Sequence, residues 1–175
     1  MSAPEFSRPV RLDMLGQAPR TIDMEASPAE RDALARRFGF VSLSSLSAVV
    51  VLERRISGVV ARGTLRAALA QSCVASGEPV EEQVEEPFEV EFRPHPETGA
   101  EEEIELGEGE LDVIFYDGAS VDVGEAVAET LSLSVEPFPR SPAAEEALRA
   151  AGVKSEEQAR EEASPFAALK GKLGK

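Results

Sequence analysis

The sequence predicts an α+β fold: a mainly antiparallel sheet of about five to seven strands, able to curl toward an open barrel, with two or three helices. Two long stretches that alternate apolar and polar residues, 59–73 and 80–92, predict strands that each bury one face. Capping sequences at residues 27–30 and 122–125 predict the starts of two helices. We expect one domain over residues 1–152 and a flexible tail over residues 153–175.

The first predicted elements precede the long alternating stretches. Residues 5–15 alternate weakly between apolar and polar side chains and predict a first strand. Ser27 and Glu30 form a capping box around Pro28, so a short helix is expected to begin here and to end at Gly39.

The centre of the chain predicts three consecutive strands. Residues 40–55 are expected to pair with the next strand through a tight turn at residues 56–58. Val49 and Val51 lie between apolar neighbours, which predicts burial on both faces of this strand. The strand over residues 80–92 then completes an antiparallel hairpin whose glutamates point away from the apolar face.

The second half of the chain predicts fewer regular elements. Residues 94–109 are rich in Gly, Pro and Glu and predict a flexible acidic loop with a short edge strand. Residues 111–116 predict another strand, which ends at an Asp-Gly turn. Asp122 is expected to cap a helix that ends before Pro137, and Ser141 to cap one or two further helical turns.

The composition is typical of a soluble, cytoplasmic protein. A single Cys excludes an intrachain disulfide, and the chain shows neither an apolar run of membrane-spanning length nor a secretory signal. We therefore expect no membrane partner. The absence of Trp and the presence of only one Tyr leave little aromatic surface on which single-stranded nucleic acid would stack.

The formal net charge of -15 is distributed unevenly along the chain. Residues 1–75 contain 10 Arg and 7 acidic residues, whereas residues 76–175 contain 8 basic and 26 acidic residues. The acidic part would repel a polyanion and attract a basic protein or peptide. Alternatively, its glutamates bind no partner and only form the solvent-exposed outer face of a sheet.

The known motifs for catalysis, cofactors and metals are missing from the sequence. It lacks a phosphate-binding loop, a dinucleotide fingerprint, a serine elbow and a two-histidine helix, so we expect neither enzymatic activity nor a cofactor. His95, the single histidine, has no second nitrogen or thiolate ligand in sequence reach, so no metal is expected there. Cys73 ends an apolar face without a histidine nearby, which favours a core residue over a nucleophile.

Several short motifs occur in a defined order: Gln71-Ser72-Cys73 at a strand end, then Glu78-Pro79-Val80, a helix led by Asp122, and a closing segment at residues 165–170. In their order and spacing they resemble the YceD-type family, which is associated with accumulation of large-subunit ribosomal RNA. Many relatives carry a second thiol where this chain has Ser76, so a metal site is not expected here. The residues that carry the resemblance are Cys73, Glu78, Pro79, Asp122, Glu129, Pro165 and Phe166.

The resemblance implies a non-catalytic factor in ribosome biogenesis. Such a factor would support processing or accumulation of large-subunit (23S) ribosomal RNA by binding precursor RNA, a basic ribosomal protein, or both; DNA is not expected as a partner. The alternative is an acidic adaptor that binds a basic protein without contacting RNA. A third reading, a hydrolase, would require a deep pocket with a carboxylate of raised pKa.

Two sets of residues are candidates for these contacts. Phosphates are neutralised by Lys and Arg, so an RNA contact would use the basic minority of the chain. The alternative is that these arginines are ordinary surface residues. The RNA-binding candidates are Arg54, Arg55, Arg62, Arg66, Lys170 and Lys172, and the candidates for binding a basic partner are Glu81, Glu85, Glu89 and Glu91.

Overall fold

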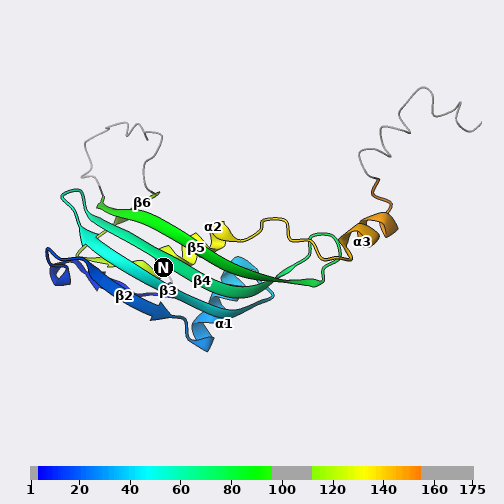
Figure 1. Ribbon diagram of the computed structural model, residues 1–175, viewed down its shortest axis with the longest axis horizontal. Coiled ribbons are helices and arrows are strands. Elements are labelled where there is room, and N and C mark those ends of the chain that lie inside the picture. Colours follow the sequence, from blue (N-terminus) through cyan, green and yellow to red (C-terminus); the bar gives the residue numbers. More distant parts are fainter. Residues whose placement is uncertain (1–3, 96–111, 155–175) are drawn as a thin grey trace, which may run out of the picture. The chain divides into compact units, whose positions relative to one another are not determined.

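The computed structural model describes residues 4–95 and 112–154, which form two compact units. The described residues of Met1–Gln71 and Glu81–Pro137 make up the first unit. It contains the helices α1 and α2 and the sheets, except for the strand residues Ser72, Pro79 and Val80 (Figure 1). The described residues of Ser72–Val80 and Phe138–Lys175 make up the second unit, which contains the helix α3.

Within the described residues, the main sheet has five strands in the order β2-β3-β4-β5-β6 and does not close into a barrel (Figure 1). β2 and β4 both run antiparallel to β3, whereas β6 runs parallel to β5. The predicted α+β fold with a mainly antiparallel sheet is thus confirmed. The strands are β2 (Arg20–Glu25), β3 (Ser42–Arg54), β4 (Val59–Ser72), β5 (Pro79–Pro94) and β6 (Asp112–Tyr116).

A second, two-stranded sheet pairs β1 (Pro9–Arg11) with β7 (Ser120–Asp122) in antiparallel orientation. The strand predicted over residues 5–15 is therefore short, because the chain turns into the 3-10 helix η1 (Leu12–Met14) directly after β1. Neither β2 nor β7 was predicted from the sequence. β7 has only three residues, too few for a visible alternation.

The two long helices begin and end as predicted. In α1 (Pro28–Phe38), the Ser27 hydroxyl accepts a hydrogen bond from the Glu30 backbone N–H, and the Glu30 carboxylate accepts one from the Ser27 N–H at 2.7 Å. In α2 (Val123–Ser134), the Asp122 carboxylate accepts a hydrogen bond from the Glu125 N–H at 3.1 Å. Among the described residues, no helix is long and apolar enough to cross a membrane.

The third helix, α3 (Ala144–Ala150), does not begin as predicted. Its N-cap residue is Ala143, which offers no side-chain hydrogen bond. The predicted cap, Ser141, instead donates its hydroxyl proton to the Glu78 carboxylate at 3.0 Å. The prediction of a Ser141 cap is wrong because this hydroxyl already has a partner outside the helix.

The core lies between one face of the main sheet and the helices α1 and α2, which lie behind the sheet in Figure 1. Leu46 and Val50 of β3 are fully buried on this face, together with Leu34 of α1 and Leu131 of α2. Val49, on the opposite face, is 45% exposed, so the prediction that both faces of β3 are buried is wrong at this position. The helices cover one face only, and a residue one position along the strand points away from them.

A β-bulge explains why the apolar residues of β3 change phase. The register moves from Leu43↔Leu69 to Ser45↔Ala68, which leaves one extra residue on β3. Leu43 and Leu46 are therefore both buried although they are three positions apart.

Candidate nucleic-acid interface

The turn between β3 and β4 lies directly against β5. The Arg55 N–H donates a hydrogen bond to the Gly58 carbonyl at 2.9 Å, and the Ser57 hydroxyl donates one to the Glu91 carboxylate. Gly58 has a φ of 156°, and a Cβ at this position would lie 1.9 Å from the carbonyl oxygen of Phe92. Glycine is therefore required for the turn to approach β5 this closely.

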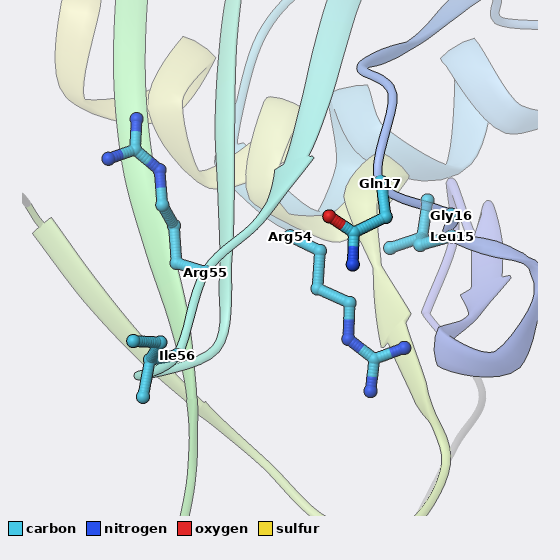
Figure 2. A pocket seen from close by; sticks show the side chains of 6 residues that line it. All are labelled: Leu15, Gly16, Gln17, Arg54, Arg55 and Ile56. Atoms are coloured by element: carbon cyan, nitrogen blue, oxygen red, sulfur yellow. The ribbon is translucent and has the colours of Figure 1, made fainter.

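A pocket of about 470 Å³ lies beside this turn (Figure 2). The Arg54 guanidinium donates a hydrogen bond to the Leu12 carbonyl at 3.3 Å, and the side chains of Arg54 and Arg55 point in opposite directions. Ile56, at the tip of the turn, is fully exposed. We call this site the basic pocket; it is lined by Leu15, Gly16, Gln17, Arg54, Arg55 and Ile56.

Arg54 differs from the other three described arginines of the predicted RNA-binding set, because no carboxylate among the described residues pairs with it. Arg55 pairs with Glu53 at 2.8 Å. Arg62 pairs with Glu89 at 2.7 Å, and Arg66 pairs with Glu85 at 2.7 Å. These exposed pairs add little stability, but each places a negative charge beside the arginine. Lys170 and Lys172 lie outside the described residues.

The ion pairs also shift the pKa values of their members. The hydrogen bond to Glu89 raises the pKa of Arg62, and the hydrogen bond from Arg62 lowers that of Glu89. The pair of Arg66 and Glu85 shows the same opposite shifts. The structure thus brings arginines of β4 and glutamates of β5 together on one face of the sheet.

Arg20, which the sequence analysis did not select, lies close to the basic pocket. It is opposite Leu52 in the register of β2 and β3, so Arg54, two residues further along β3, is its diagonal neighbour on the same face. Arg20 is exposed and forms no ion pair with a described residue. The alternation of Ile22 and Met24 with acidic residues was the signal that could have revealed β2.

The four glutamates predicted to bind a basic partner have different surroundings. Glu81 is exposed, and Glu85 and Glu89 pair with arginines of β4. Glu91 is only 6% exposed, so the expectation that it points outward is wrong. Its carboxylate accepts hydrogen bonds from Arg93, at 2.7 Å, and from Ser57, which lower its pKa in spite of burial. Glu91 therefore anchors the β3–β4 turn.

Cys73 belongs to a hydrogen-bond network in the second unit. Its thiol is 3% exposed, as predicted for a core residue, and its sulfur accepts a hydrogen bond from the Ser141 N–H at 3.2 Å and one from the Ser76 N–H at 3.4 Å. The Ser76 and Ser141 hydroxyls lie 3.0 Å apart, and both donate to the Glu78 carboxylate. The described residues contain no group of three or more His, Cys, Asp or Glu that could hold a metal ion.

Asp122 has a structural role in the first unit. Besides capping α2, its carboxylate accepts hydrogen bonds from the Ser7 hydroxyl at 2.5 Å and the Arg8 N–H at 2.8 Å. The chain at Phe6 passes so close to α2 that a Cβ on Gly124 would lie 2.2 Å from the Phe6 carbonyl oxygen. Asp122 therefore fastens the N-terminal segment to the start of α2.

The remaining residues that carry the family resemblance are Pro79, Glu129, Pro165 and Phe166. Pro79 begins β5, and Pro165 and Phe166 lie outside the described residues. Glu129 is exposed on α2, where partial desolvation and the nearby Glu125 carboxylate raise its pKa against the effect of Arg37. Glu129 does not line the basic pocket.

The fold and the basic pocket define an α+β protein with an open sheet and a candidate anion-binding site on its surface. Residues 61–171, more than half of the chain, match the family model described as large ribosomal RNA subunit accumulation protein YceD. The chain therefore belongs to the YceD family. No curated protein and no solved structure matches the chain.

Proposed function

We propose that this chain is a non-catalytic, cytoplasmic factor in ribosome biogenesis that contacts precursor large-subunit ribosomal RNA through the basic pocket. The description of the family names the ribosomal RNA, and the pocket offers suitable chemistry for it. The observation that carries the proposal is that Arg54 lines a pocket and has no carboxylate partner among the described residues.

The chemistry of Arg54 suits a phosphate or an unstacked base. A guanidinium group binds phosphate through two parallel N–H donors, and its plane can also stack on a base. The Gln17 amide adds donors to the same pocket, and Arg20 adds a second cation nearby. Arg62 and Arg66, in contrast, would have to exchange Glu89 and Glu85 for the RNA.

The acidic character of the rest of the chain favours an RNA contact that is confined to a small part of the surface. With a net charge of -15, most of the chain repels a polyanion, so RNA would approach where cations lack carboxylate partners. The affinity should therefore depend on few phosphate contacts and weaken only moderately as salt is raised.

The test compares three variants that each lose one positive charge. We expect Arg54→Gln to weaken binding of a precursor ribosomal RNA fragment roughly tenfold, measured by fluorescence anisotropy. Arg66→Gln is expected to have a much smaller effect, because Glu85 already neutralises Arg66. Arg149→Gln, on α3, is the control for net charge. Equal affinity of the wild-type protein and Arg54→Gln would contradict the proposal.

The cellular consequence is tested by depletion. Immature large-subunit RNA is expected to accumulate, and the protein is expected to co-sediment with precursor particles. Normal RNA processing in a clean deletion strain would argue against the assembly role.

A second candidate is an adaptor that binds a basic protein without contacting RNA. It is favoured by Glu81 and Glu86, which are exposed on β5 and pair with no described arginine. A pull-down with and without ribonuclease distinguishes the two functions, since only partners bridged by RNA are lost on digestion.

A further inference from the structure

The outer edge of β2 presents backbone groups that the sheet does not use. The Ala26 N–H donates to the Leu46 carbonyl at 2.9 Å, which continues the register of β2 and β3 by one residue. In an antiparallel pair, residues alternate between those that bond to the neighbouring strand and those that point away. The even-numbered residues of β2 therefore bond to β3, and the odd-numbered residues, Thr21, Asp23 and Glu25, direct their N–H and C=O groups outward.

Most of these outward groups are unused within the described part of the chain. The Glu25 carbonyl accepts a hydrogen bond from Arg8 at 3.1 Å. Neither the backbone groups of Thr21 and Asp23 nor the Glu25 N–H has a described partner. All three residues are exposed, and β2 forms one border of the main sheet (Figure 1). Such an edge can accept one more strand.

The side chains beside this edge favour a basic partner. Asp23 is opposite Val49 and Glu25 is opposite Ser47, so both carboxylates lie on the face away from the helices. A depression of about 290 Å³ between these residues has Val49, which is 45% exposed, in its lining. The aliphatic stem of a Lys or Arg can cover Val49 while its charged group reaches a carboxylate.

We propose that the β2 edge binds an extended, basic segment of a partner protein, which adds to the main sheet as a further strand. A cation directly opposite Asp23 or Glu25 forms a favourable cross-strand pair. A second copy of this chain fits less well, because it would bring two sets of Asp23 and Glu25 to the same edge. The depression beside the β2 edge and the basic pocket share no lining residue.

The test uses a synthetic peptide of alternating Val and Lys, with a peptide of alternating Val and Glu as the control for charge. Binding to the full chain is followed by amide chemical shifts and by hydrogen exchange. The Val–Lys peptide is expected to shift and protect the amides of Thr21, Asp23 and Glu25. The Val–Glu peptide is expected to leave these amides unchanged.

A proline variant separates edge pairing from simple charge attraction. Thr21→Pro removes an outward N–H without changing the net charge and without removing a hydrogen bond to β3. It is expected to weaken binding of the Val–Lys peptide roughly tenfold, whereas Thr21→Val, which keeps the N–H, binds as the wild-type protein does.

Any one of three results would overturn this proposal. The first is that the chemical shifts of the β2 amides do not change up to about 1 mM Val–Lys peptide. The second is that the Val–Glu peptide protects these amides to the same extent, and the third is that a folded Thr21→Pro variant binds the Val–Lys peptide with unchanged affinity. If Thr21→Pro does not fold, hydrogen exchange in the wild-type protein still shows whether the Val–Lys peptide protects the outward amides of β2. Arg54→Gln should bind the peptide normally, so failure of the RNA contact and failure of the edge contact can be told apart.

Discussion

At the scale of single residues, Cys73 shows how a buried side chain acquires an unusual acidity. The Ser141 N–H, followed by hydrogen bonding from Ser76, lowers the pKa of the thiol from 9.0 to about 6, although burial acts in the opposite direction. Near neutral pH the sulfur is therefore largely a thiolate, which accepts these hydrogen bonds better than a thiol does.

This lowered pKa predicts a pH dependence of stability. Because the pKa of Cys73 is lower in the folded than in the unfolded chain, its contribution is complete above pH 9.0 and is lost as the pH falls toward about 6. We expect the free energy of unfolding, measured with urea, to rise over this range in the wild-type protein and to rise less in Cys73→Ala. Thiolate absorbance in the ultraviolet gives the pKa directly, and an ordinary value would refute the prediction.

At the scale of elements, α1 is stabilised at its start by one carboxylate that has two partners. Glu30 accepts the Ser27 N–H in the capping box and also pairs with Arg8 at 2.6 Å. The Arg8 hydrogen bond, with help from Ser27, lowers the pKa of Glu30 to about 2. The residues from Phe6 to Arg8 are thereby held to α1 through Glu30 and to α2 through Asp122.

We expect loss of the α1 cap to destabilise the first unit. Ser27→Ala removes the acceptor for the Glu30 N–H and should lower the free energy of unfolding by about 1 kcal/mol, as measured by urea denaturation. Ser42→Ala is the matched control, because Ser42 is exposed at the start of β3 and should cost less than about 0.5 kcal/mol. Equal effects of both substitutions would show that the cap contributes nothing.

At the scale of the whole molecule, the net charge of -15 opposes the compact state. The structure reduces this repulsion locally, because arginines of β4 pair with glutamates of β5 on one face of the sheet. Arg54 and Arg20 remain outside these pairs at the end of the sheet that carries the β3–β4 turn. The RNA contact that we propose lies at this end of the sheet.

The same repulsion predicts that salt stabilises the protein. Sodium chloride at about 0.5 M shortens the Debye length below about 5 Å and screens the acidic surface, so the midpoint of thermal unfolding should rise from its value at low salt. Exposed ion pairs weaken at the same time, but each is worth little. Calorimetry at several chloride concentrations measures the trend, and a falling midpoint would contradict it.

Features that depend on near neighbours in the chain were determined by the sequence alone. The alternation over residues 59–73 places Val59, Leu65 and Leu69 on the buried face, and the structure confirms this. The starts of α1 and α2 follow from Ser27 and Asp122, whose acceptors reach an N–H three residues later. These patterns are visible because the period of a strand and the geometry of a cap are local.

Only the tertiary structure decided which charged residues are available for binding. The register of the sheet brings Arg62 to Glu89, and the close approach of the β3–β4 turn to β5 buries Glu91. The tertiary structure also places Gln17 beside Arg54, although the chain between these two residues includes the whole of α1. The sequence alone therefore determined which strands carry the charges, and the pairing of distant strands decided which charges are neutralised, because that pairing depends on packing against a common core.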